Sequence, residues 1–212
     1  MRAYSHREIL QILSGLLVAM LTSMISTSIV GVALPTIVGE LGAQEQLSWV
    51  AGATLLTMTA STPLWGKMSD LFGRKHMFQV ALGLFVASSL LAGFATNMGT
   101  LIFARAVQGL GMGGMTALTQ IILGDVVAPG SRGRYSGYIG AVFGVSTVTG
   151  PLIGGFIVDA PWLGWRWCFF VGVPSPSPRW SSSSGFCGPT ASRRTPGSTG
   201  GAPSRSPAGR RR

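Results

Sequence analysis

The chain has 212 residues, of which 10% are charged, against about 25% in soluble domains, and its mean hydropathy is +0.44. This composition excludes an ordinary soluble enzyme and favours a protein that lies in a bilayer, while 2 cysteines exclude a disulfide scaffold and a thiolate-rich metal site. Seven arginines fall within residues 175–212 and residues 1–174 carry a net charge of +3, so the net charge of +10 is mainly a property of the tail.

Five apolar stretches of about 17–25 residues follow one another along the first 174 residues. They are Leu10–Leu34, Trp49–Trp65, Met77–Ala95, Thr100–Leu123 and Ser136–Val158, and a sixth begins at Trp165. At 1.5 Å per residue each can cross about 30 Å of hydrocarbon, and all are too long for barrel strands. The sequence therefore predicts an all-α, polytopic transmembrane helical bundle over residues 1–174, with five helices and the start of a sixth.

The basic residues between the apolar stretches predict the orientation of the bundle. Alternate connections and the amino-terminal segment hold seven Lys and Arg residues, and the other connections hold only Arg166. By the positive-inside rule we expect a multi-pass protein of the plasma membrane with a cytoplasmic N-terminus. The first stretch is too long for a cleaved signal peptide and no A-x-A site follows it, so we interpret it as a signal anchor.

The connection after the second stretch reads GKMSDLFGRKHMF and resembles the signature G-x-x-x-D-x-x-G-R-[RK] of the major facilitator superfamily. The matching residues are Gly66, Asp70, Gly73, Arg74 and Lys75. Glycines permit a tight turn, and the acid and the bases can form charge-assisted bonds in one conformation that break in another. The resemblance implies a gating role; the alternative is a short basic loop that only sets orientation.

The fourth stretch contains ARAVQGLGMGGM, which is similar to the motif R-x-x-Q-G-x-G-x-G of the same superfamily. Arg105 is expected inside the membrane, where a charge is costly and is a functional candidate. The resemblance implies proton coupling or substrate binding by Arg105, and Gln108 is expected to reach a substrate or a neighbouring helix. The alternative for Arg105 is a side chain that extends to the nearer membrane surface.

The fifth stretch, GAVFGVSTVTGPLIGG, resembles the G-x-x-x-G-P-x-x-G-G signature of exporters in this superfamily. We expect Gly144, Gly150, Gly154 and Gly155 to make close helix contacts and Pro151 to weaken the helix locally. The resemblance implies export and bending of this helix. The alternative is a glycine-rich packing face with no directional meaning.

The first stretch, with Ser28, Ile29, Val30, Ala33, Leu34 and Pro35, resembles the fourteen-helix drug:proton antiporter branch. Ser26 stands where that branch usually has Asp, and Gly31 where Asn is frequent. None of the five stretches contains Asp or Glu, so proton coupling would depend on residues beyond this chain. The resemblance as a whole implies the N-terminal half of a major facilitator fold and proton-coupled efflux of drug-like or amphiphilic molecules by alternating access.

Residues 175–212 form a Ser-, Pro-, Gly- and Arg-rich segment that we expect to be a disordered tail. It interrupts a membrane helix that has just begun, which suggests a truncation or frame-shifted read after Pro174; a genuine basic tail is the alternative. Two other functions stay open: a transport-incompetent fragment of a transporter, and a membrane protein whose tail binds nucleic acid or lipid.

No catalytic constellation, phosphate-binding loop, metal site or cofactor is predicted, so the chain is not expected to be an enzyme. His6 and His76 are isolated in the sequence. The expected partners are a small-molecule substrate and the lipid bilayer, without nucleic acid. A missing C-terminal half or self-association is expected to be required for transport.

Overall fold

The computed structural model describes residues 6–41, 44–127, 129–160 and 165–170, and within these ranges the chain is helical without any β-strand. The helices are α1 (His6–Leu41), η1 (Gln44–Gln46), α2 (Leu47–Phe72), α3 (Arg74–Gly93), α4 (Met98–Val126), η2 (Pro129–Ser131), α5 (Arg132–Asp159) and α6 (Trp167–Phe170). The all-α fold class is therefore confirmed. The predicted tail, 175–212, lies outside the described residues.

The helices run past the apolar stretches that predicted them, and only the last two residues of the third stretch fall outside its helix. Polar residues are included at the ends because side chains there satisfy free backbone groups. The side chain of Asn97, for example, accepts a hydrogen bond from the Thr100 amide at 2.8 Å and so begins α4.

Four described helices, α1, α3, α4 and α5, are long and apolar enough to cross a membrane. The helix α2 is not among them, although it has 26 residues. Threonines, serines and two charged residues lower its hydropathy. Its hydroxyl groups bond to carbonyl oxygens of the preceding turn, as Thr59 does to Leu55 at 2.9 Å. A hydroxyl satisfied in this way costs little in lipid, so the sequence of α2 remains compatible with a membrane helix.

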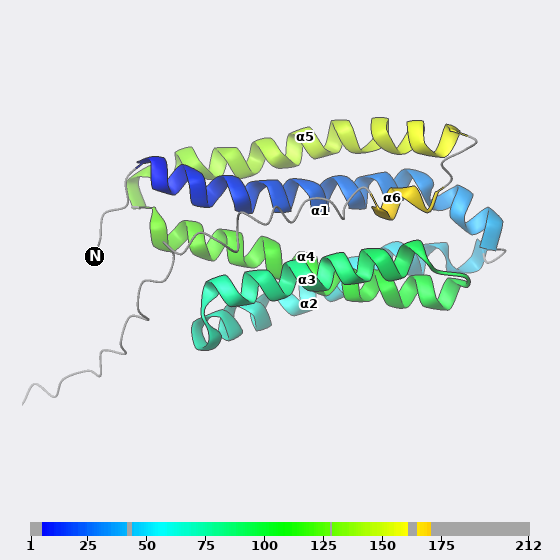
Figure 1. The fold of residues 1–212 in the computed structure, drawn as a ribbon, viewed down its shortest axis with the longest axis horizontal. Helices are drawn as coiled ribbons and strands as arrows, with labels where there is room; N and C mark the ends of the chain where they lie inside the picture. Colours follow the sequence, from blue (N-terminus) through cyan, green and yellow to red (C-terminus); the bar gives the residue numbers. More distant parts are fainter. Residues whose placement is uncertain (1–5, 42–43, 128, 161–164, 171–212) are drawn as a thin grey trace, which may run out of the picture.

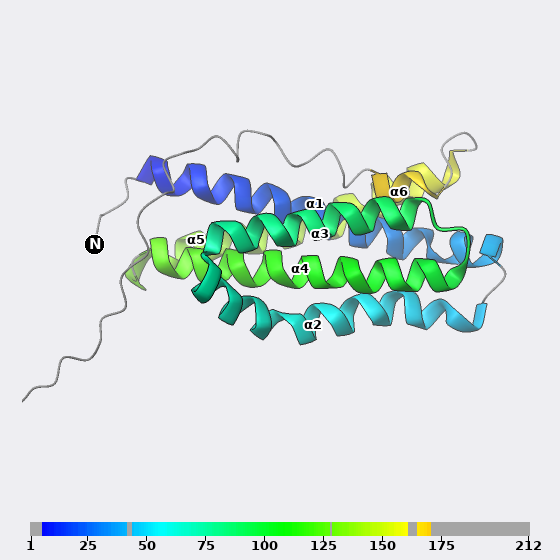
Figure 2. The same cartoon turned by 60° about the horizontal axis from the view of Figure 1, so that its bottom comes forward.

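The long helices form two groups that lie side by side (Figure 1). In one group α1 packs against α5, and in the other α4 packs against both α2 and α3. The single turn α6 contacts α1 and α3 and therefore touches both groups. Contacts between α1 and α4 join the groups, and the buried residues Ile29, Leu101 and Phe169 share one apolar cluster there. Figure 2 shows α4 between α2 and α3, with α2 bent along its length.

Glycines give α4 two flat faces. A Cβ atom at Gly109 or Gly113 would lie 2.3 or 2.6 Å from a main-chain oxygen of α2, and one at Gly111 would lie 2.8 Å from a main-chain oxygen of α3. The backbones approach this closely because the side chains are absent. Two α2 side chains then reach α4 carbonyl oxygens: Thr57 bonds to Ala106 and the Trp65 indole bonds to Leu110, at 2.8 and 2.9 Å.

Candidate functional site

Gly73 alone connects α2 to α3, because α2 ends at Phe72 and α3 begins at Arg74. Its φ of 88° is a conformation that residues with a side chain rarely adopt. The Gly73 amide bonds to the Ser69 carbonyl oxygen, and its own carbonyl accepts from the Met77 amide. The two helices therefore share their terminal hydrogen bonds through one residue.

Arg74 joins the ends of three helices. Its Nη2 atom lies 3.3 Å from Asp70 Oδ1 on α2, and its Nη1 atom contacts Asp125 Oδ2 on α4. Nη1 also donates to the Ile121 carbonyl oxygen at 3.2 Å. We call Arg74, Asp70 and Asp125 the arginine junction. Its side chains are partly exposed, so each ion pair contributes only about 0–1 kcal/mol to stability, and the geometry matters more than the energy.

The remaining residues of the loop signature are Lys75 and Gly66, and both lie beside the junction. Lys75 forms no ion pair with the residues that the structure describes. Lys75 follows Arg74 in the first turn of α3 and is half-buried. A Cβ atom at Gly66 would lie 3.8 Å from Ile121 Cδ1, an ordinary contact distance. The observed packing therefore leaves room for a side chain at this position.

Sequence reasoning missed Asp125 and Arg132. Arg132, in the first turn of α5, donates to the Gly124 carbonyl oxygen at 2.5 Å and to the Val127 carbonyl oxygen at 3.3 Å. Arg132 thus bonds to carbonyl groups at the end of α4, and Arg74 bonds to the Ile121 carbonyl oxygen, which lies one turn earlier in the same helix. Asp125 could have been noticed as an acid seven residues before Arg132, but its pairing with Arg74 depends on how α4 packs.

A second polar group lies inside the bundle around Arg105, which is 2% exposed. Arg105 is seven residues into α4, about 10 Å from the helix start at 1.5 Å per residue. Its Nη1 atom donates to Gln108 Oε1 at 2.5 Å, and Gln108 Nε2 donates to Ser89 Oγ on α3 at 2.8 Å. Since Arg105 extends toward Gln108, away from the nearer helix end, the structure does not support the interpretation that it reaches the membrane surface.

Arg105 has no carboxylate partner within the described parts of the chain. Its Nε atom lacks a hydrogen-bond partner there, as does the Oγ atom of Ser26, which is also buried. The face of the Phe169 ring lies 6.0 Å from Arg105 Cζ and provides a weak cation–π contact. A buried guanidinium held only by neutral groups can accept a further anionic or polar partner.

A third feature is the close contact between α1 and α5. A Cβ atom at Gly150 would lie 2.4 Å from Ser28 Cβ, and one at Gly154 would lie 3.1 Å from the Ile29 main chain. Gly144 and Gly155 do not belong to this contact, because a Cβ atom added at either would have nothing of the described structure within 4 Å. Residues four apart share a helix face, as Gly150 and Gly154 do, and the other two point elsewhere. Pro151 lies inside α5 and is exposed.

The three features are separate in space along the bundle. The arginine junction lies where α2 and α4 end, the Arg105 group lies inside, and the Gly150 contact lies between α1 and α5. No group of three potential metal ligands occurs among the residues that the structure describes. The three features are thus a partly exposed cluster of ion pairs at one end of the bundle, a buried charge and a close helix contact.

Residues 16–175 match the sequence profile of the Major Facilitator Superfamily. The chain is 41% identical over 163 residues to multidrug transporter protein MdtP of Bacillus subtilis, covering 77% of this chain and 30% of that protein. It is 42% identical over 162 residues to efflux pump dotC of Dothistroma septosporum, with 76% and 27% coverage. Multidrug resistance protein 3 of Bacillus subtilis is 40% identical over 160 residues, with 76% and 31% coverage. The chain spans about 30% of the length of these relatives.

Two solved structures resemble the fold. The crystal structure of a D-xylose–proton symporter superposes with a TM-score of 0.68 at 16% identity, covering 79% of this chain and 46% of that chain. The inward-open xylose transporter XylE from E. coli gives a TM-score of 0.64 at 20% identity, with 81% and 49% coverage. At these identities the likeness shows a shared fold.

Proposed function

Because this chain belongs to the Major Facilitator Superfamily and is a multi-pass membrane protein, we propose that it forms the first bundle of an exporter of drug-like or amphiphilic small molecules. In this proposal the exporter works by alternating access, in which two bundles rock about a central binding site. Membership of a transporter family agrees with the prediction that the chain is not an enzyme.

One observation carries the proposal: the buried guanidinium of Arg105. A charge inside a membrane bundle costs free energy and marks a substrate or ion pathway by default. Arg105 is 2% exposed and is held by Gln108 and Ser89 without a carboxylate in the described residues. We propose that Arg105 and Gln108 bind the substrate or take part in its coupling to protons.

The arginine junction is the proposed gate. Arg74 binds acids from α2 and α4 while Gly73 holds α3 directly against α2. Exposed ion pairs of about 0–1 kcal/mol each can break at little cost when the bundle moves. Such a junction stabilises one conformation without preventing the other.

Export, rather than import, is supported by the names of the relatives, which describe multidrug transport, efflux and multidrug resistance. The close contact at Gly150 and Gly154, beside Pro151, provides a tightly packed pair of helices that can rock as one unit. Proton coupling requires an acid, and the described membrane helices carry acids only near their ends. The coupling acid is therefore proposed to lie in a second bundle.

The second candidate is a bundle that cannot transport alone, and the observation that favours it is the share of its relatives that the chain spans, about 30%. A whole-cell assay separates the two candidates. Bacteria that lack their own efflux pumps express the chain, the Arg105→Ala variant or the Trp49→Phe control, and ethidium accumulation is measured. If a further copy of the chain supplies the second bundle by self-association, we expect lower ethidium accumulation with the chain and with the control than with the empty vector, and no such decrease with Arg105→Ala.

Equal accumulation in all strains and in the empty-vector strain would refute transport by this chain alone and favour the second candidate. A third proposal, that the basic tail binds nucleic acid or lipid, concerns residues outside the described part. Removing residues 175–212 tests it: loss of nucleic-acid or vesicle binding with unchanged membrane integration would support it.

We propose that the end of the bundle with Arg74 and Arg132 faces the cytoplasm of the plasma membrane, as the distribution of basic residues predicts. Single cysteines at Gly133 and at Glu45, in a background without Cys168 and Cys187, test the orientation. We expect a membrane-impermeant maleimide to label the Glu45 position in intact cells and the Gly133 position only after permeabilisation. The reverse pattern would refute the orientation.

A further inference from the structure

The indole of Trp165, two residues before α6, is fixed between two charged groups. Trp165 Nε1 donates to Glu40 Oε2, near the end of α1, at 2.6 Å. The guanidinium carbon of Arg166 lies 4.9 Å from the centroid of the Trp165 ring. The charged acceptor makes this hydrogen bond stronger than one between neutral groups, and the stacked cation adds to it. The bond joins residues 125 positions apart in the sequence.

The burial of Trp165 distinguishes it from an ordinary tryptophan at a membrane surface. Surface tryptophans place their rings among lipid headgroups, as the exposed fractions of Trp49 (65%) and Trp167 (52%) allow. Trp165 is 3% exposed and its polar atom faces a carboxylate of the same chain. Its position therefore serves a contact within the protein.

The same turn reaches the buried arginine. The rings of Trp165 and Phe169 meet edge to face, with centroids 6.2 Å apart and planes at 81°. Phe169 is fully buried, and its ring centroid lies 6.0 Å from Arg105 Cζ. A continuous series of contacts therefore runs from Glu40 through Trp165 and Phe169 to Arg105.

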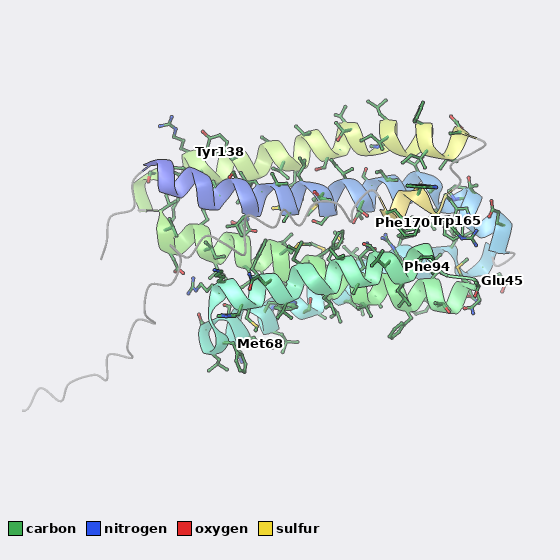
Figure 3. All side chains as sticks on the ribbon, viewed as in Figure 1. Glu45, Met68, Phe94, Tyr138, Trp165 and Phe170 are labelled. Carbon is green, nitrogen blue, oxygen red and sulfur yellow. The ribbon has the colours of Figure 1, made fainter. Side chains whose placement is uncertain are left out.

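The other side of the turn rests on α3. The rings of Phe94 and Phe170 meet edge to face at 5.6 Å, and Figure 3 shows both near Trp165 at this end of the bundle. A Cβ atom at Gly93 would lie 2.8 Å from the Phe170 ring, so the turn is closely packed there. The Glu40 bond holds it to α1, and the Phe170 contact holds it to α3.

We propose that Glu40 and Trp165 are positioning residues that fix α6, a single turn, to α1 and thereby keep Phe169 over Arg105. Glu40 has no ion pair within the described ranges; the other charged residues at this end are Glu45 on η1, Asp159 at the end of α5, and Arg166. The docking of α6 on α1 can be tested without measuring transport. Its importance for coupling rests on the role proposed above for Arg105.

Cys168 reports this docking directly, because it lies between Trp165 and Phe169 in the sequence and is fully buried. Cys187 is replaced by serine, so that Cys168 is the single thiol of the chain, and its alkylation by N-ethylmaleimide is timed in native membranes. Trp165→Phe keeps an aromatic ring but removes the donor and one of the two fused rings, and Glu40→Ala removes the acceptor without changing the indole. We expect each to accelerate alkylation about tenfold, as the loss of one charged hydrogen bond implies.

Three further variants make the result specific. Glu40→Gln keeps an acceptor oxygen and is expected to label more slowly than Glu40→Ala. Glu45→Ala removes a nearby acid that has no ion pair in the described structure and is expected to label at the parent rate. The Trp165→Phe, Glu40→Ala double variant is expected to label no faster than the faster single variant, since both changes remove one bond.

General loosening of the bundle is monitored at a distant buried site. Ser146→Cys on α5, 3% exposed, is made in a background without Cys168 and Cys187. Its alkylation rate is expected to stay unchanged when Trp165→Phe is added. Parent-rate alkylation of Cys168 in both single variants, multiplicative rates in the double variant, or an equal increase at Ser146→Cys would overturn the proposal. None of these results depends on transport.

Discussion

The contact between α1 and α5 predicts that alanine substitutions at two glycines of α5 have very different effects on the stability of the chain. In Gly150→Ala the new methyl group would lie 2.4 Å from Ser28 Cβ and 2.5 Å from Ser28 Oγ. Since the Ser28 Cβ atom is fixed to its backbone, α1 and α5 must move apart. Overpacking of this kind costs about 1–3 kcal/mol.

Gly155→Ala is the matched control, because nothing in the described structure lies within 4 Å of its new Cβ atom. Both changes occur inside α5, so the gain in helix propensity is common to them and cancels in the comparison. Thermal unfolding of the detergent-solubilised chain measures the difference. At about 2–4 °C per kcal/mol for a chain of this size, we expect Gly150→Ala to unfold several degrees below Gly155→Ala.

The double variant Gly150→Ala, Ser28→Gly tests the cause. Removing the Ser28 side chain makes room for the new methyl group. Gly150→Ala is therefore expected to lower the unfolding temperature much less in the Ser28→Gly background than in the parent chain. If Gly150→Ala proves as stable as Gly155→Ala, or if Ser28→Gly gives no recovery, the close α1–α5 contact is not as described.

Three other substitutions follow from the polar contacts. Gln108→Leu removes the partner of the buried Arg105 guanidinium and is expected to destabilise the chain by about 1.5–3 kcal/mol in thermal unfolding. Trp65→Phe removes an indole bond to an α4 carbonyl oxygen and is expected to cost about 1 kcal/mol, whereas Trp49→Phe, at an exposed site, is expected to be neutral. Asp125→Asn is expected to change stability by less than about 1 kcal/mol, because the junction is partly exposed, but to reduce ethidium efflux in cells.

Each of these expectations has a contrary outcome. A Gln108→Leu variant as stable as the parent would mean that Arg105 has another partner. Equal losses in Trp65→Phe and Trp49→Phe would show that the carbonyl bond contributes nothing. If Asp125→Asn lowers ethidium accumulation as much as the parent chain does, the arginine junction is not required for gating.

The helices could be predicted from sequence because long apolar runs in lipid have few alternatives to the α-helix. Their ends were predicted less well, because α2 continues through Lys67 and Asp70, and α5 begins at Arg132. These residues are helical because they lie beyond the apolar core, where their charged groups bond to each other or to free carbonyl groups. Hydropathy alone does not contain that information.

The candidate site was predictable only where both partners are close in sequence. Asp70 and Arg74 are four residues apart across one tight turn, and this proximity indicated their contact. The bond between Arg105 and Gln108 was not predicted, although residues three apart on one helix are neighbours. Asp125 and Ser89 were missed because they come from other helices and meet these residues only after packing. The close contacts expected at Gly144 and Gly155 are absent from the described structure for the same reason, because the tertiary structure determines which face of α5 is covered by α1.

The single-residue connection at Gly73 has a mechanical consequence. No flexible linker separates α2 from α3, so a rotation of α2 about its axis also moves Arg74, the first residue of α3. A residue with a side chain at this point would be strained at a φ of 88°, and an inserted residue would introduce slack. The position of Arg74, and with it the geometry of the arginine junction, therefore depends directly on the position of α2.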